Sequence, residues 1–165
     1  MMPKLVVFAG PPCTGKSTVA RLLPFAHIEM DAVRERILPG AAHTRDDRAV
    51  AYRAALMMAE SLLPHAGVVI VNGGFGREED RLQYRQIVFE TGSELFVVEF
   101  AAPLDVLLER NRARRSHHPG LDLDDARVTE IVQAYPWLNT GLRIDATQPP
   151  AACARAIRLY IGEDA

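Results

Sequence analysis

One stretch near the amino terminus decides the fold: Gly10-Pro11-Pro12-Cys13-Thr14-Gly15-Lys16-Ser17-Thr18. It matches the phosphate-binding pattern Gly-x-x-x-x-Gly-Lys-[Ser/Thr] in full. The apolar run 5–9 comes directly before it and is typical of a buried strand, while 16–23 continues as a helical pattern that Pro24 ends. Because strand, glycine-bounded loop and helix is the context that this pattern requires, the stretch predicts a binding site for a nucleoside triphosphate.

Each residue type in this loop has a physical task. The glycines let backbone N–H groups curl round the phosphates, and the start of the helix adds its positive end. Lys16 would reach the outer phosphates, and the Ser17 hydroxyl would ligate Mg²⁺. We therefore expect ATP and Mg²⁺ as cofactors, with residues 10–18 as their binding residues.

The composition is that of one globular domain, expected over residues 1–165, with 48% apolar and 24% charged residues. No apolar run approaches the ~20 residues of a membrane span. A signal peptide is not expected, because cleavage after the first apolar run would destroy the loop. Two cysteines, Cys13 and Cys153, give no disulfide framework, so we expect a cytoplasmic protein. The net charge of −2 argues against a broad nucleic-acid surface but leaves a local basic channel open.

Strand and helix patterns alternate along the chain. That alternation predicts an α/β sandwich around a parallel sheet. The segment 116–120 interrupts a pair of charged helices and is predicted to be a mobile loop. The strand candidates are 4–9, 26–30, 68–72, 95–100 and 142–145, and the helical stretches are 15–23, 32–38, 46–64, 77–91, 103–115, 123–135 and 150–161.

Asp31 and Arg34 follow the second strand candidate. One interpretation is that Asp31 only caps the helix 32–38, a position that aspartate favours. The other is functional, because ligands of an open parallel sheet bind beyond the carboxyl ends of its strands. Arg34 is three residues further on the same helix face and could orient the carboxylate or hold a substrate group.

The third strand candidate ends in Asn72 and runs into a glycine-rich turn at 73–76. Many ATPases place an acid at this strand end to help organise Mg²⁺, but this chain has asparagine. Arg77, Arg81 and Arg85 repeat on the next helix, where a solvated charged face is expected for most of them. One of the three could face an acceptor pocket, and the sequence does not say which.

Helix 103–115 ends in a run with four arginines. Some of this charge only complements the helix dipole. Arg110 and Arg114 share a face and could stabilise a transferring phosphoryl group when a lid closes. We interpret His117 and His118 as solvated loop histidines rather than metal ligands, and Trp137 as a packing residue.

With these residues in view, the chain resembles the small P-loop kinases (AAA_33-like P-loop NTPases) that include polynucleotide 5′-hydroxyl kinases, zeta-type toxins and chloramphenicol phosphotransferase. The resemblance covers nearly the whole chain. It rests on the loop 10–18, the pair Asp31-x-x-Arg34, the strand 68–72 with its arginine-bearing helix, and the run 110–114.

This resemblance implies a three-layer fold with a five-stranded parallel sheet in the order 2-3-1-4-5 and a helical lid at about 110–135. It implies that Asp31 activates an acceptor hydroxyl, that Arg34 lies near the acceptor's phosphate and that Arg114 acts on the transferring phosphates beside Arg110. It also places the segment 147–150 near adenine. Asn72 departs from several relatives, which leaves open what organises Mg²⁺ besides Ser17 and water.

We therefore expect an ATP-dependent phosphotransferase that moves the γ-phosphate to a hydroxyl of a small molecule or nucleoside-type acceptor. The alternatives are a polynucleotide 5′-hydroxyl kinase and a nucleotide-binding switch or slow ATPase. Tyr52, Met57 and Met58 could line the acceptor pocket, although helical spacing makes them core candidates first. The Cys13 thiol, near a helix start and a lysine, is expected to have a lowered pKa.

Overall fold

The computed structural model describes residues 2–40, 44–117 and 123–163. A five-stranded parallel sheet lies at its centre, in the order β2-β3-β1-β4-β5. This confirms the order implied by the resemblance. The strands are β1 (Lys4–Ala9), β2 (Ala26–Glu29), β3 (Val68–Asn72), β4 (Glu94–Ala101) and β5 (Leu142–Asp145).

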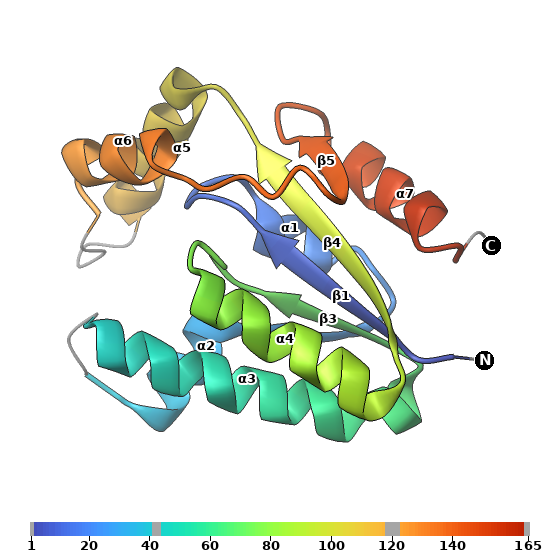
Figure 1. Ribbon diagram of the computed structural model, residues 1–165. Coiled ribbons are helices and arrows are strands. Elements are labelled where there is room, and N and C mark those ends of the chain that lie inside the picture. Colours follow the sequence, from blue (N-terminus) through green and yellow to red (C-terminus); the bar gives the residue numbers. More distant parts are fainter. Residues whose placement is uncertain (1, 41–43, 118–122, 164–165) are drawn as a thin grey trace.

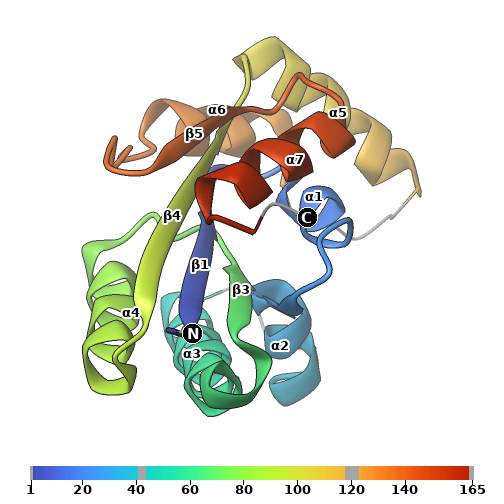
Figure 2. The ribbon, with the colours of Figure 1, turned by 90° about the vertical axis from the view of Figure 1, so that its right-hand side faces the viewer.

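Helices cover both faces of this sheet and extend past its carboxyl edge. Helices α3 and α4 pack on one face and α1 and α7 on the other, while α5 and α6 stand beyond the strand ends (Figures 1 and 2). No helix in the described part of the chain is both long and apolar enough to cross a membrane. The helices are α1 (Lys16–Ala20), α2 (Met30–Ile37), α3 (Arg45–Ala66), α4 (Glu78–Thr91), α5 (Leu104–His117), α6 (Asp125–Gln133) and α7 (Pro150–Tyr160).

Strand β1 is central because its side chains are apolar on both faces. Leu5 and Val7 pack under α3, whereas Val6 and Phe8 pack under α1 and α7, and all four are fully buried. Strand β3 is buried at every position in the same way. A strand with two buried faces reads as a continuous apolar run, which is why the sequence located these strands.

The helix boundaries differ from the predicted ones by a few residues, and side-chain caps explain two of the differences. Thr44 caps α3 through the Asp47 amide at 3.2 Å, so the helix begins at residue 45. Asp124 caps α6, which therefore begins two residues later than expected. Helix α5 continues to His117, so the predicted loop begins later, and residues 118–120 lie outside the described part.

The two ends of the chain meet at the amino edge of the sheet. Lys4 Nζ donates to the Ile161 carbonyl at 2.8 Å and to the Glu163 carboxylate at 2.6 Å. Both termini therefore lie on the side opposite to α5 and α6 (Figure 1).

Candidate active site

The predicted phosphate loop, residues 10–17, joins β1 to α1 at the carboxyl edge of the sheet. Gly10 has a φ of +140°, and a Cβ on it would lie 2.6 Å from the Phe100 carbonyl oxygen, so only glycine fits. The Gly10 amide donates to the Gly74 carbonyl at 3.3 Å. Contacts with the chain after β3 and with β4 therefore fix the start of the loop.

Lys16 folds back over the loop that carries it. Its Nζ donates to the carbonyl oxygens of Gly10 at 3.0 Å and Pro11 at 2.8 Å, and to Thr14 Oγ1 at 3.2 Å. Burial lowers the pKa of Lys16 to about 8, although the Asp31 carboxylate acts in the opposite direction. An arriving polyphosphate would favour the charged form of this buried ammonium.

Ser17, the predicted metal ligand, lies in the first turn of α1. Its hydroxyl donates to Glu29 Oε1 and accepts from Asn72 Nδ2, the latter at 2.8 Å. Glu29 and Asn72 end their strands as register neighbours. Sequence reasoning missed Glu29; the signal that could have found it is an acid in the last position of a strand at the ligand-binding edge.

Asp31 and Arg34 are neighbours on α2 but form only a long ion pair. Helix α2 begins at Met30 with Glu29 at the N-cap, so Asp31 lies in the first turn, and its interpretation as the cap is wrong. Arg34 Nε lies 4.0 Å from Asp31 Oδ1, with side chains 12% and 70% exposed, respectively. Among the charges that raise the pKa of Lys16, the Asp31 carboxylate is the strongest.

Arg110 bridges the phosphate loop and the chain that follows β5. Its Nη2 donates to the Ala146 carbonyl at 2.7 Å, and its Nη1 donates to the Cys13 carbonyl at 3.5 Å. Arg114, one turn further along α5, is exposed, and its positive charge acts to lower the pKa of Cys13. Both predicted lid arginines therefore lie on the face of α5 that meets the loop, whereas Thr18 is exposed on α1.

The Cys13 side chain packs against α5. Its Sγ donates to Asn111 Oδ1 at 3.7 Å, and the buried Asn111 donates through Nδ2 to the Leu123 carbonyl before α6 at 3.0 Å. Burial raises the pKa of Cys13 and outweighs the opposing charges of Arg114 and Lys16. The predicted lowering of this pKa is therefore wrong, because α5 covers the thiol.

The three arginines of the α4 region have different surroundings. Arg77 is the N-cap of α4, and Arg85 forms an exposed ion pair within the same helix at 2.9 Å. Arg81 is buried: its Nε donates to the Phe75 carbonyl at 2.9 Å, and its Nη2 donates to the Pro136 carbonyl at 2.5 Å. Arg81 is thus the exception to the solvated face expected for most of the three, and it joins two loops that lie far apart in the sequence.

A strap of residues 135–139 leads from α6 to β5. The Tyr135 hydroxyl donates to the Gly74 carbonyl at 2.6 Å, and this same carbonyl accepts the Gly10 amide. Trp137 packs against the Tyr135 ring with 4.6 Å between ring centroids, in line with its predicted role. The Gly74 carbonyl therefore connects the strap to the phosphate loop.

A buried carboxylate holds the other half of the strap. Glu99, in β4, is 1% exposed and accepts from the backbone amides of Leu138 at 2.7 Å and Asn139 at 3.0 Å. Arg143 Nη2 lies 3.5 Å from the Glu99 carboxylate. Two amides and a nearby guanidinium therefore compensate this carboxylate for its removal from water.

The predicted acceptor-pocket residues on α3 do not lie together. Tyr52 is buried, its hydroxyl accepts the Phe75 amide at 2.8 Å, and burial raises its pKa. Met57 and Met58 are exposed on the outer side of the helix. The core prediction is therefore confirmed for Tyr52 and wrong for the two methionines.

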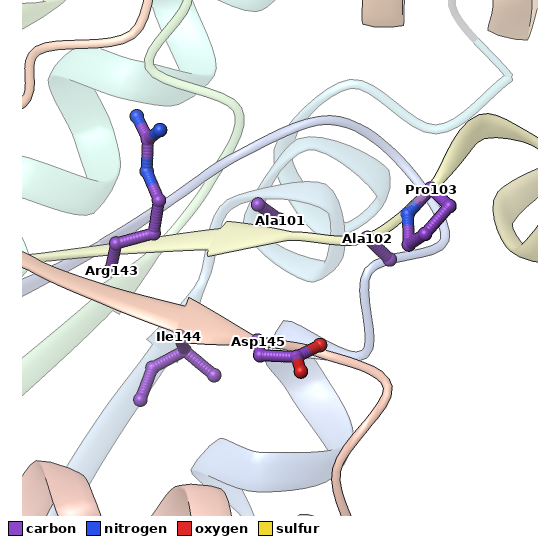
Figure 3. A pocket seen from close by; sticks show the side chains of 6 residues that line it. All are labelled: Ala101, Ala102, Pro103, Arg143, Ile144 and Asp145. Atoms are coloured by element: carbon purple, nitrogen blue, oxygen red, sulfur yellow. The ribbon is translucent and has the colours of Figure 1, made fainter.

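A shallow hollow of about 320 Å³ opens between the ends of β4 and β5 (Figure 3). The Asp145 carboxylate on its rim accepts from the amide and hydroxyl of Thr147 at 3.0 and 2.6 Å. These hydrogen bonds lower the pKa of Asp145. The hollow contains no residue of the phosphate loop and borders the segment 147–150 that we expect near adenine. Its lining residues are Ala101, Ala102, Pro103, Arg143, Ile144 and Asp145.

The sequence that forms this site matches a known protein family. The model of the AAA domain family AAA_33 matches residues 5–136. The chain belongs to this family. The matched part of this AAA_33 chain runs from β1 through α6 and includes the loop, the Asp31–Arg34 pair and the α5 arginines.

One curated relative of this AAA_33 chain is the uncharacterized protein Rv2004c of Mycobacterium tuberculosis. The two are 30% identical over an alignment of 162 positions, which covers 88% of this chain and 32% of the relative. The chain thus spans about a third of the length of the curated relatives that it matches first.

Solved structures show the same fold over the full length. A candidate kinase from Chloroflexus aurantiacus superposes with a TM-score of 0.78 at 23% identity, covering 97% of this chain and 99% of that one. The APS kinase CysC of Mycobacterium tuberculosis, in complex with AMPPNP and APS, has a TM-score of 0.76 at 21% identity, covering 98% of both chains. The AAA_33 chain therefore has the fold of the small P-loop kinases.

Proposed function

We propose that this protein is an ATP-dependent phosphotransferase that moves the γ-phosphate of ATP to a hydroxyl of a small-molecule or nucleoside-type acceptor. One observation carries the proposal. The Asp31 carboxylate, in the first turn of α2 just past the end of β2, is 70% exposed and opposes the lowering of the Lys16 pKa by burial. A phosphate-binding loop with an exposed carboxylate nearby suits transfer to a hydroxyl, whereas a nucleotide switch needs no such carboxylate.

The nucleotide side of the mechanism uses the loop and α5. The loop amides and Lys16 bind the β- and γ-phosphates, and Arg114, with Arg110, adds positive charge where negative charge spreads in a loose transition state. Ser17 supplies a hydroxyl oxygen, the donor type that Mg²⁺ prefers. A Mg²⁺ held there would supply positive charge against the phosphates.

The acceptor side uses α2. Asp31 would accept a hydrogen bond from the attacking hydroxyl and align it, which matters more than strong basicity when the transition state is loose. Arg34 is mostly buried, and its one ion pair among the described residues is the 4.0 Å contact with Asp31. Its remaining N–H donors are thus available to an oxygen-rich group on the acceptor.

The test is a transfer assay with γ-labelled ATP over nucleosides, sugars, antibiotics and oligonucleotide ends. A polynucleotide acceptor, the alternative, would bind more weakly as salt rises, whereas an uncharged acceptor would not. Turnover that stays at the rate with water across the whole panel would instead favour a switch or slow ATPase.

Asp31→Asn is the decisive variant once an acceptor is found. We expect its ATP affinity to stay near that of the wild type, while transfer falls by roughly 10²- to 10⁴-fold. Asp105→Asn, which changes an exposed first-turn aspartate of α5, is the matched control and should leave transfer unchanged. Full turnover in Asp31→Asn would remove this carboxylate from the mechanism.

A further inference from the structure

Asn72 stands at a strand end where many P-loop NTPases have a negatively charged residue for Mg²⁺. P-loop NTPases hold Mg²⁺ with the loop Ser or Thr and an acid that is separate from the loop. Here β3 ends in Asn72, which is 3% exposed and neutral. A neutral amide cannot provide the negative charge that offsets the cost of taking water from a small, strongly hydrated dication. That charge has to come from another residue near Ser17.

Glu29 lies one strand away at the same level of the sheet. It ends β2 and is the register partner of Asn72, and both side chains reach the Ser17 hydroxyl. Within residues 2–40, 44–117 and 123–163, Glu29 is the one carboxylate that is hydrogen-bonded to Ser17. Its side chain is 27% exposed, so water can reach its oxygens.

We propose that Glu29 supplies the carboxylate that organises Mg²⁺ at Ser17, so that the acid expected at the end of β3 is carried by the neighbouring strand β2. The inference rests on the proposed function, because it concerns the metal of a nucleotide held in the loop. The residues fit this ion, since a hydroxyl and a carboxylate are oxygen donors and Mg²⁺ keeps several waters beside them. Such a site needs no larger acidic cluster, and the described residues contain none.

The direction of the hydrogen bonds at Ser17 supports this assignment. Because Ser17 donates its proton to Glu29, that bond can persist when a lone pair of the same oxygen turns to a cation. Asn72 instead donates to the Ser17 oxygen at 2.8 Å and so competes for the lone pairs that a cation needs. The Glu29 contact therefore leaves both lone pairs of the Ser17 oxygen for other partners, whereas the Asn72 contact occupies one of them.

The other charged neighbours do not replace Glu29 in this role. Within the described part of the chain, the ion pair of Asp31 is with Arg34, and Asp31 makes no hydrogen bond to Ser17. Arg21 reaches Glu29 Oε2 at 3.5 Å, but its side chain is 67% exposed, and such surface pairs contribute little. Glu29 therefore keeps its charge available for a metal-bound water.

The experiment measures how Mg²⁺ changes the binding of ADP that carries a fluorescent N-methylanthraniloyl group. The wild type, Glu29→Gln, Asn72→Asp and the double variant are titrated in EDTA and across a series of Mg²⁺ concentrations. We expect Glu29→Gln to bind the nucleotide in EDTA at least as well as the wild type. Its apparent Mg²⁺ affinity should fall by about 10- to 100-fold, as it does when the partner that orients a metal ligand is removed.

The double variant is the most discriminating test, because its Asn72→Asp change restores one carboxylate near Ser17, now from strand β3. We expect it to recover about tenfold or more of the lost Mg²⁺ affinity. Glu35→Gln, which removes an exposed charge from α2, should leave that affinity unchanged. If Glu29→Gln fails to fold by circular dichroism, Glu29→Asp, which shortens the carboxylate arm, should weaken Mg²⁺ while leaving binding in EDTA intact.

Three outcomes would overturn the inference: unchanged Mg²⁺ affinity in a folded Glu29 variant, a double variant no better than Glu29→Gln, or a wild type whose ADP binding does not respond to Mg²⁺. Failure of the proposed function looks different. In that case the wild type would bind the nucleotide, with or without a response to Mg²⁺, but would transfer phosphate to no acceptor of the panel.

Discussion

Two regions at the carboxyl edge of the sheet differ in how firmly they are held. We call the loop with Lys16 the phosphate corner, and the exposed side chains of α2 and α3 beside Asp31 the acceptor corner. In the phosphate corner, the loop is held by the Gly74 carbonyl and packs closely on β4, and Lys16 makes three hydrogen bonds. In the acceptor corner, Asp31 is 70% exposed and contacts Arg34 only at 4.0 Å. The ion pair between Arg45 and Glu79 at 3.6 Å is exposed on both sides.

We interpret this difference through the proposed function. Polyphosphate and metal have a fixed geometry, so preformed backbone contacts would lower the cost of binding them. An acceptor corner made of exposed side chains on α2 and α3 could change its acceptor by surface substitution, without disturbing the sheet. Under this proposal, the fold specifies the phosphate donor much more tightly than the acceptor.

The largest expected effect tests how rigid the phosphate corner is. Gly10→Ala places a Cβ 2.6 Å from a backbone oxygen at a φ of +140°, which should cost about 4 kcal/mol of unfolding free energy. Gly40→Ala, at the end of α2, also has a positive φ but open space, and should cost about 1 kcal/mol. Urea denaturation measures both, and equal losses would contradict the contrast between the corners.

The strap 135–139 is also held by fixed polar contacts, and the Glu99 carboxylate makes the main ones. Glu99→Ala would leave the Leu138 and Asn139 amides without their acceptor, so we expect a loss of about 3 kcal/mol in unfolding free energy. Glu94→Ala, at the exposed start of the same strand, is the control and should change it by less than about 0.5 kcal/mol. Similar losses for the two variants would show that the strap is not fixed by this carboxylate.

The pH dependence of nucleotide binding tests the charge of the phosphate corner. The pKa of Lys16 is lowered to about 8 by burial, so the free protein loses this charge as pH rises through that value. Phosphates favour the charged form, so binding above pH 8 takes up a proton, and ADP affinity should fall by up to about tenfold per pH unit. Isothermal titration between pH 7 and pH 9.5 measures this fall.

Two comparisons decide the interpretation of that profile. Below the pKa of Lys16 the ammonium is already formed, so the affinity should be flat there. Lys16→Met should bind weakly at every pH, without the fall above pH 8. A wild-type affinity that stays constant across the whole range would show that this lysine does not carry the interaction with phosphate.

The smallest expected effect concerns the outer side of α3. Met58 is 46% exposed, so Met58→Gln should change the unfolding free energy by less than about 0.5 kcal/mol. It should also leave the KM for the acceptor unchanged, because this side chain faces away from the core. A raised KM would extend the acceptor corner onto this helix face.

Much of the fold could be predicted because its strongest signals are local. The strands 4–9, 68–72 and 142–145 have the predicted bounds, since apolar runs between turn residues mark them directly. The loop 10–18 was recognisable because backbone geometry and charge both depend on its own residues. The sheet order followed from the resemblance rather than from the strands themselves.

What the sequence did not reveal depends on partners far along the chain. Helical spacing made Met57 a core candidate. Which face of α3 is covered by α4 and the sheet depends on tertiary packing, which the spacing does not reveal. The Glu29 carboxylate pairs with a residue of another element, and the buried guanidinium of Arg81 reaches a carbonyl 55 residues further along the chain. Such long-range polar contacts leave no periodic pattern.

The meeting of the two chain ends at Lys4 and Glu163 has a consequence for larger proteins that carry this domain. Both ends leave from the rear of the molecule, away from the loop and from α5 and α6 (Figure 1). A neighbouring module joined at either end would sit behind the catalytic edge and leave access for substrates. The same polypeptide can thus serve as one unit of a longer enzyme without rebuilding its binding surface.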